Sequence, residues 1–193
     1  MLYHVSLDLI EKFELRVPES CFDGEDKTIK RICFAKSVEG AITAMPYNIN
    51  ILSGLLNLKK EFDIEPILYV YSIDEKDLSP RDIKDSSELM FECLVSDANI
   101  TSEVWVLTEN IKPKLTAIKV IDFNFDIKRL GNSAMYIVTK LKYEEITQDE
   151  INKNQKAWSE ISSAVEKEIN RCITPVLKRA YVASLSSFMS KNN

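Results

Sequence analysis

Apolar residues along most of the chain fall into short segments with the composition and spacing of β-strands. These segments are rich in β-branched and aromatic residues, which suit a pleated and partly buried surface, or they alternate between apolar and polar positions. The predicted strands are Leu2–Ser6, Arg31–Ala35, Pro66–Ile73, Leu89–Val95, Val104–Leu107, Leu115–Phe125 and Met135–Tyr143.

Helical spacing is weaker in the same region. Ser37 is a predicted N-cap, because a short polar side chain there precedes apolar residues at helical spacing. The sequence Asp8–Phe13 is compatible with one turn of helix. The sequence Tyr47–Lys60 predicts a loop followed by a helical turn. Asp97–Ser102 is a polar loop that leads into the strand Val104–Leu107.

After residue 146 the pattern becomes helical. Thr147 and Glu150 have the spacing of a capping box, and apolar residues then recur at helical spacing. Thr174-Pro175 predicts a second helix start, since proline is favoured at the first helical position. Strands followed by helices gathered at the end indicate an α+β fold. The predicted organisation is one α+β domain at 1–145, with a C-terminal helical extension at 146–193 packed on the same core.

The composition and net charge limit the classes of protein to which the chain can belong. The chain has 193 residues, 45% of them hydrophobic and 28% charged, with a net charge of −5, as in a globular domain. Without a basic excess to neutralise phosphates, general nucleic-acid binding is unlikely. No segment reaches the roughly 18 apolar residues of a membrane helix, so no membrane association is expected. Four scattered cysteines and no signal-peptide pattern favour a cytoplasmic location.

Few residues in the sequence are candidates for catalysis or ligand binding. Glu103 stands where the polar loop meets the buried strand, which suits either a fixed functional carboxylate or a solvated strand end. His4 is the only histidine, and it could meet Cys33 or a serine in space. Glycine-rich phosphate loops and metal-ligand spacings are absent from the sequence, so no metal site is expected. Trp105 and Trp158 are predicted core residues.

Three short motifs nevertheless occur in a familiar order. Tyr3-His4-Val5-Ser6, Arg31-Ile32-Cys33-Phe34-Ala35 and Ser102-Glu103-Val104-Trp105-Val106 resemble the three strand motifs of the ADP-ribosyltransferase superfamily of the diphtheria-toxin and poly(ADP-ribose) polymerase type. The resemblance covers residues 2 to about 125. It implies an ADP-ribosyltransferase-like split β-sandwich core.

The resemblance also implies NAD as substrate and assigns roles to individual residues. His4, with Ser6 beside it, would bind the nicotinamide ribose, and Glu103 would stabilise the oxocarbenium ion formed as nicotinamide leaves. Cys33, Phe34 and Ser37 would belong to the NAD-binding wall. Phe34 or Tyr47 would supply the ring that stacks on nicotinamide.

Three departures from the family pattern keep several functions open. Val5 stands where the family has glycine, and Cys33 where it usually has tyrosine. The third motif has one glutamate, Glu103, with Thr101 two residues earlier, so the Glu-x-Glu pattern of arginine-modifying toxins is absent. One hypothesis is a mono-ADP-ribosyltransferase-like enzyme, of a type found in phages and mobile elements, that acts on a protein or nucleic-acid acceptor. The alternative is a catalytically inactive relative that binds or inhibits a macromolecular target. A third is an RNA 2′-phosphotransferase-like or NAD-hydrolysing activity on the same fold.

Overall fold

The structure, a computed structural model, describes residues 1–18, 25–130 and 133–154. Its strands form a seven-stranded antiparallel sheet in the order β4-β5-β2-β1-β3-β6-β7. The strands are β1 (Leu2–Ser6), β2 (Ile32–Ala35), β3 (Ile67–Ile73), β4 (Ile83–Lys84), β5 (Glu103–Val106), β6 (Lys114–Leu130) and β7 (Ser133–Glu145).

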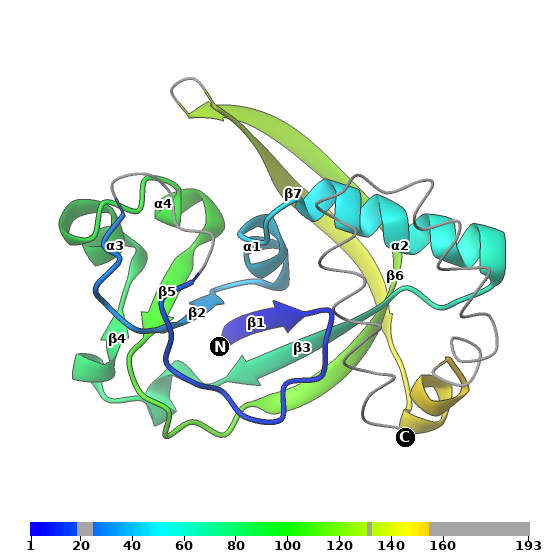
Figure 1. Cartoon of the computed structure of the whole chain (residues 1–193), viewed down its shortest axis with the longest axis horizontal. Coiled ribbons are helices and arrows are strands. Elements are labelled where there is room, and N and C mark those ends of the chain that lie inside the picture. Colours follow the sequence, from blue (N-terminus) through cyan, green and yellow to red (C-terminus); the bar gives the residue numbers. More distant parts are fainter. Residues whose placement is uncertain (19–24, 131–132, 155–193) are drawn as a thin grey trace.

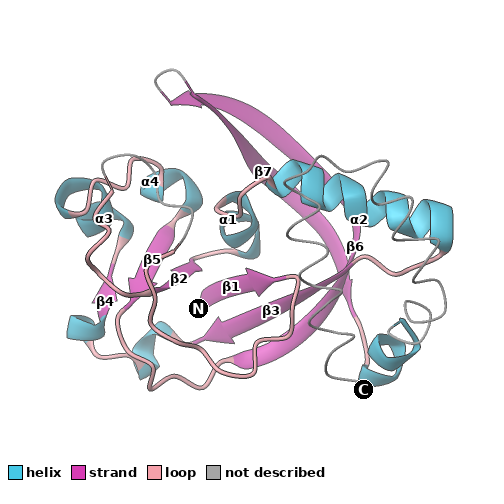
Figure 2. Cartoon of the chain, viewed as in Figure 1, coloured by secondary structure: helices cyan, strands magenta, loops and turns pink. Residues whose placement is uncertain are grey.

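Helices lie beside both ends of this sheet (Figures 1 and 2). Among the described residues they are α1 (Val38–Thr43), α2 (Asn48–Phe62), α3 (Ser86–Glu92) and α4 (Ala98–Thr101), with 3-10 turns η1 (Glu75–Asp77) and η2 (Pro80–Asp82) and helical residues at 148–154. α3 and α4 contact β5, whereas α2 contacts β6 and β7. The α+β class is therefore confirmed.

The predicted strands are confirmed with one exception. Leu89–Val95 was expected to be a strand, and this is wrong: its first part belongs to helix α3. The Asp85 side chain accepts from the backbone N–H groups of Ser87 and Glu88, and Glu88 caps the Asp85 N–H in return. This capping box fixes the start of α3, and Leu89 is then buried on the inner face of the helix.

The helix predictions were less accurate. Asp8–Phe13 contains no helix, and Tyr47–Lys60 is mostly one 15-residue helix, α2, rather than a loop with one turn. The segment Asp97–Ser102 includes the short helix α4 instead of being a simple loop. The capping box at Thr147 is confirmed, because Thr147 and Glu150 exchange side-chain-to-backbone hydrogen bonds. The later helical prediction, with Trp158 and Thr174-Pro175, lies outside the described residues.

The sheet is loosely joined at its centre. β1 and β3 are in register over five residue pairs, but β1 and β2 share only the pair Tyr3–Ala35. The two strands therefore diverge beyond Tyr3, where the His4 side chain bonds to the Cys33 carbonyl. This divergence gives side chains of β1 and β2 access to a common pocket.

The start of β5 is held against α1 by a close backbone approach. A Cβ atom on Gly40 would lie 2.2 Å from the carbonyl oxygen of Thr101, whereas real Cβ contacts essentially never fall below 3.0 Å. The Lys36 N–H also donates to the Ser102 carbonyl at 3.1 Å. Glycine at position 40 thus lets α1 approach the residues directly before Glu103.

Substitution of Gly40 by alanine is therefore expected to destabilise the fold by about 1–3 kcal/mol, the usual cost of overpacking a site. Gly54 offers a matched control, because a Cβ there meets nothing within 4 Å inside helix α2. Gly54→Ala should stabilise the protein by about 0.5–1 kcal/mol, since alanine has the better helix propensity. Urea unfolding of both variants measures the difference. Equal effects of the two substitutions would show that the Gly40–Thr101 approach is not tight.

The β6–β7 hairpin extends well beyond the rest of the sheet (Figure 1). Phe125, Ile127 and Tyr136 are exposed on it, by 41%, 61% and 42%. Its inner part packs on the body, where Thr43 Oγ1 accepts from the Val138 N–H and Asn48 donates to the Tyr136 carbonyl. Among the described helices, none is long and apolar enough to cross a membrane.

Candidate functional site

Residues from three neighbouring strands line one pocket of about 460 Å³. His4 comes from β1, Cys33 and Phe34 from β2, and Glu103 from β5. These strands are adjacent in the sheet, in the order β5-β2-β1, although His4 and Glu103 are 99 positions apart in the sequence. The volume is within the range of about 300–1,000 Å³ that is usual for small-molecule sites.

Glu103 is fixed firmly at the first position of β5. Its backbone pairs with Ala35, its carbonyl accepts a hydrogen bond from Ser86 Oγ at 2.8 Å, and Ser102 before it has a left-handed φ of 54°. The side chain is 9% exposed and its Oε1 accepts from Trp105 Nε1 at 2.8 Å. A solvated strand end, one of the two sequence interpretations, is therefore wrong.

Burial raises the pKa of the Glu103 carboxyl, and hydrogen bonds from Trp105 and the Cys33 thiol partly oppose that rise. The nearby carboxylates of Asp97 and Glu25 raise the pKa of Glu103 further. Burial, followed by the charge of Glu103, also raises the pKa of the Cys33 thiol well above its ordinary value. Cys33 is thus a neutral hydrogen-bond donor to Glu103 rather than a nucleophile.

His4 is held between β1 and β2 in one tautomer. Its Nδ1 lies 2.8 Å from the carbonyl oxygen of Cys33, and since a carbonyl only accepts, Nδ1 carries the proton. Phe13, Phe34 and Tyr71 surround the ring, with centroid distances of 5.2, 5.7 and 6.3 Å. The other ring nitrogen, Nε2, is left as a hydrogen-bond acceptor.

Burial lowers the pKa of His4 below its ordinary value of 6.5, outweighing the hydrogen bond to Cys33, and the charge of Arg16 lowers it further. Between the lowered folded pKa and 6.5, the unfolded state binds more protons than the folded state, so stability falls as the pH falls. His4→Gln should remove this part of the acid sensitivity. Urea midpoints of wild type and variant between pH 7.5 and about pH 5 measure it, and parallel curves would contradict a buried neutral His4.

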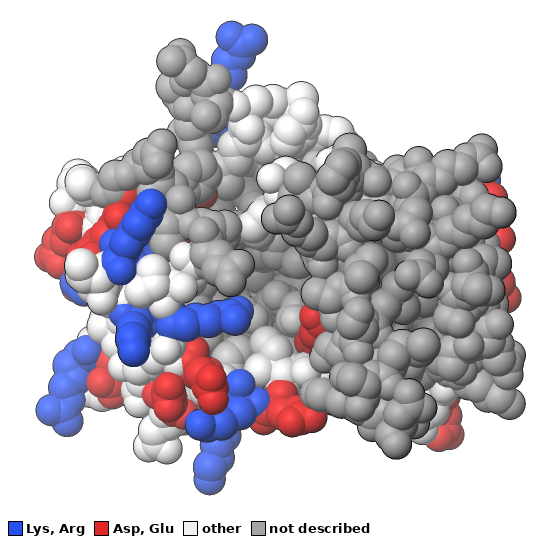
Figure 3. All heavy atoms as spheres, in the orientation of Figure 1, with Lys and Arg blue, Asp and Glu red and all other residues white. Residues whose placement is uncertain are grey.

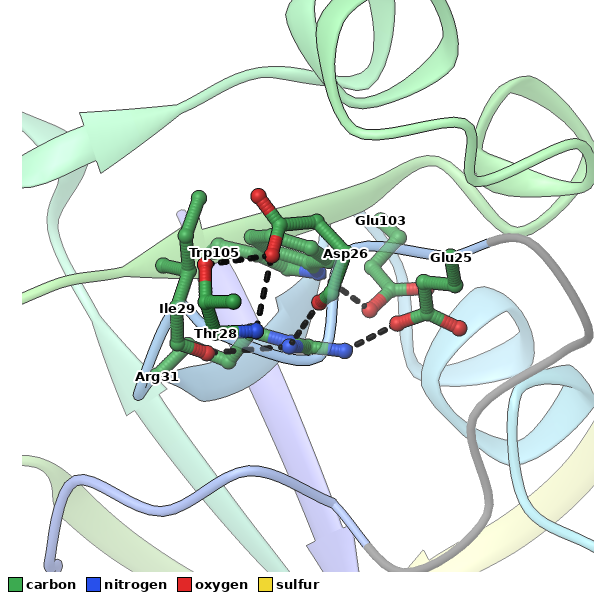
Figure 4. A network of polar contacts seen from close by, with 7 residues as sticks. All are labelled: Glu25, Asp26, Thr28, Ile29, Arg31, Glu103 and Trp105. Carbon is green, nitrogen blue, oxygen red and sulfur yellow. Dashed lines mark hydrogen bonds and ion pairs between the residues drawn. The ribbon is translucent and has the colours of Figure 1, made fainter.

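A buried cation, Arg31, lines the same pocket and stacks on the Trp105 ring. Arg31 is 1% exposed, and its guanidinium carbon lies 3.6 Å from the centroid of the Trp105 ring. Arg31 forms an ion pair with Glu25 and donates to the carbonyls of Asp26 and Ile29 at 3.1 and 3.0 Å (Figure 4). The indole that binds Glu103 is therefore itself held by a buried guanidinium.

Not every predicted site residue lies in the pocket. Ser6 accepts a hydrogen bond from the Asp8 N–H at 3.1 Å, Ser37 caps α1 through the Gly40 N–H at 2.9 Å, and neither lines the pocket. Tyr47 is 55% exposed and also lies outside the lining. For the stacking role, the geometry favours Phe34 over Tyr47.

The pocket brings together charges that the sequence analysis did not single out. Lys12, Arg16 and Arg31 line it together with Glu25 and Asp97. The described part of the surface in Figure 3 likewise mixes basic and acidic side chains. Arg31 lies directly before β2 and two residues from Cys33, and this alternate spacing was the available signal for Arg31. The one sequence feature that indicated Asp97 as a pocket residue is its position six residues before Glu103.

Metal ligation has no support within residues 1–18, 25–130 and 133–154, where no three His, Cys, Asp or Glu side chains form a group that could hold an ion. The chain matches no protein-family model, and comparison with curated proteins and with solved structures gives no significant match. Its function is therefore inferred from the pocket.

Proposed function

We propose that this protein is a mono-ADP-ribosyltransferase-like enzyme that binds NAD in this pocket and transfers ADP-ribose to a macromolecular acceptor. The proposal rests on one observation. The same pocket is lined by His4, Cys33, Phe34 and Glu103. These residues come from the three motifs that resemble the ADP-ribosyltransferase superfamily. The loosely joined centre of the sheet, between β1 and β2, is consistent with the split core that the same resemblance implies.

The charges of the pocket suit the charges of NAD. Its nicotinamide ring is cationic, which matches the carboxyl groups of Glu103 and Asp97, and its pyrophosphate is anionic, which matches Lys12 and Arg16. The acceptor nitrogen Nε2 of His4 is suited to a ribose hydroxyl. These matches support NAD over a nucleotide without a cationic base.

The reaction would use Glu103 for electrostatic stabilisation. The bond between the ribose C1′ and the nicotinamide nitrogen breaks, nicotinamide leaves as a neutral molecule with the bonding electrons, and positive charge develops on the ribose. A carboxylate fixed beside that charge stabilises the transition state, because it needs no reorganisation as the reaction proceeds. The hydrogen bonds from Trp105 and Cys33 keep the Glu103 carboxyl in place.

A second function, binding of a macromolecular partner without catalysis, is favoured by one specific observation. Val5, which stands where the family has glycine, lines the pocket and is 7% exposed. Its side chain occupies space that a glycine would leave to a ligand. The exposed Phe125, Ile127 and Tyr136 of the hairpin offer such a binding protein an apolar contact surface.

Incubation of the purified full chain with NAD decides between the two functions. The enzyme hypothesis predicts release of free nicotinamide and a rise in melting temperature with NAD concentration, because a ligand that binds only the folded state stabilises it. ADP-ribose can be included as a comparison ligand that lacks nicotinamide. An unchanged melting temperature together with undetectable nicotinamide would exclude the enzyme and leave the binding function.

A further inference from the structure

The surroundings of Glu103 oppose its ionisation. Burial raises the pKa of its carboxyl, and the carboxylates of Asp97 and Glu25 raise that pKa further. The proposed reaction needs the ionised form, because only a carboxylate stabilises positive charge that develops on the ribose. A pocket that uses Glu103 in this way therefore needs groups that keep the carboxyl ionised.

Two side chains that donate to Glu103 also lie close to Arg31. Trp105 Nε1 donates to Glu103 Oε1 at 2.8 Å, and the guanidinium carbon of Arg31 lies 3.6 Å from the centroid of the same indole. Cys33 donates to Glu103 as well. Burial and then the charge of Glu103 raise the pKa of the Cys33 thiol, whereas Arg31 lowers it, so the thiol lies near both groups. Arg31 is thus connected to Glu103 through an indole and through a thiol.

The position of Arg31 on the indole strengthens the hydrogen bond to Glu103. A cation on the face of an indole draws electron density from the ring, which makes the N–H at the ring edge a better donor. Trp105 is fully buried and Arg31 is 1% exposed, so water screens the effect little. The guanidinium is fixed by Glu25 and by the carbonyls of Asp26 and Ile29 (Figure 4).

We propose that Arg31 is a positioning residue for Glu103, which polarises the Trp105 indole and thereby keeps the Glu103 carboxylate ionised and in place. The part of Arg31 in a reaction rests on the proposed ADP-ribosyltransferase function, whereas its effect on Glu103 does not. Glu25 moderates that effect, because its carboxylate attracts the same guanidinium. Removal of the Glu25 charge should therefore favour ionised Glu103, and removal of Arg31 should oppose it.

Infrared titration of the full chain measures the ionisation of Glu103 without NAD. The protonated-carboxyl band that Glu103→Gln removes identifies the signal. Glu25→Gln should lower the pH midpoint of this band. Addition of Arg31→Met to Glu25→Gln should raise the midpoint again by about half a pH unit or more, a roughly threefold change in the ionisation equilibrium. Trp105→Phe should raise the wild-type midpoint by about one pH unit or more, since a hydrogen bond to a charged group is lost.

The Glu25→Gln background keeps the comparison from depending on folding, because neither protein then contains a buried Glu25 carboxylate without its cation. Arg81→Lys, at an exposed position of η2, is the control and should leave the midpoint unchanged. If the double variant does not fold, Arg31→Lys replaces it, and its midpoint should exceed that of wild type because an ammonium lacks the planar stack. The other charged or titratable groups that line the pocket stay constant in these proteins: His4, Lys12, Glu14, Arg16, Cys33 and Asp97.

The Trp105 indole proton tests the route of the effect. A stronger hydrogen bond moves an N–H proton resonance downfield, and Trp105→Phe identifies the signal of Trp105 between the two tryptophans of the chain. Addition of Arg31→Met to Glu25→Gln should move this resonance upfield. A raised midpoint with an unmoved indole proton would overturn the route through Trp105. A lower melting temperature with an unmoved midpoint would show that Arg31 is only structural, and this would overturn the proposal.

Nicotinamide release then separates this proposal from the proposed enzyme. If Glu103 acts in the reaction, the acid limb of the rate should move with the midpoint of Glu103 in each variant. Midpoints that shift as expected without any nicotinamide release would overturn the enzyme and leave the effect of Arg31 on Glu103. Nicotinamide release with unchanged midpoints would do the reverse.

Discussion

Glu103→Gln is expected to lower the rate of nicotinamide release from NAD by about 100- to 1,000-fold, the usual loss when one group that stabilises transition-state charge is removed. The substitution keeps the shape of the side chain and an oxygen that can accept from Trp105 Nε1. It removes the negative charge that would face the developing oxocarbenium ion. The loss should therefore fall on kcat, with a small change in KM.

The fold should survive this substitution. Glu103 is buried, and burial raises the pKa of its carboxyl because it disfavours the charged form. A neutral amide at this position does not carry the desolvation cost of a buried charge. The melting temperature should be equal to or above that of wild type. Glu61→Gln, at an exposed position of α2, is the control and should change neither rate nor stability. Unchanged nicotinamide release by a folded Glu103→Gln variant would remove Glu103 from the chemistry.

Arg31→Met is expected to destabilise the protein by about 3–5 kcal/mol, the usual cost of breaking a buried ion pair by removing one partner. The side chains of Arg31 and Glu25 are 1% and 7% exposed, so Glu25 would lose its ion-pair partner while still buried. The substitution also removes two hydrogen bonds to backbone carbonyls and the cation at 3.6 Å from the Trp105 ring. Methionine fills similar volume, so the loss reports on charge more than on packing.

A double-mutant cycle with Glu25→Gln isolates the pair. Arg31→Met combined with Glu25→Gln should be less destabilised than the sum of the two single variants, because no buried carboxylate then remains without its cation. Chemical denaturation of the four proteins gives the coupling free energy. Additive effects would mean that the pair does not contribute as a unit. Arg31→Lys should recover only part of the stability, since an ammonium cannot both pair with Glu25 and stack on the indole.

The strands of this protein could be predicted from sequence because their signal is local. Val104, Trp105 and Val106 are consecutive β-favouring residues, and all three are fully buried in β5. Helix α3 was missed because its apolar residues imitate a strand, although the capping box of Asp85 and Glu88 marks its start. Helix α2 was predicted only as a loop and a helical turn, because Asn48-Ile49-Asn50-Ile51 alternates between polar and apolar residues.

The candidate site was predictable only in part. His4, Cys33, Phe34 and Glu103 could be named from the order of three motifs, and the structure brings them to one pocket. The contacts around Glu103 could not be predicted from the order of these motifs. Arg31 stacks on the Trp105 ring that donates to Glu103, and Asp97 lies directly before α4, which contacts β5. These contacts depend on tertiary packing and leave no periodic pattern in the sequence.

We propose that His4 and Glu103 belong to one NAD-binding pocket. The most direct measurement is a crystal structure of the Glu103→Gln variant with NAD, in which slow turnover would preserve the bound dinucleotide. The predicted result is the nicotinamide ribose between His4 and position 103, with a ribose hydroxyl on His4 Nε2. NAD bound away from these residues, or a pocket that stays empty at saturating NAD, would contradict it.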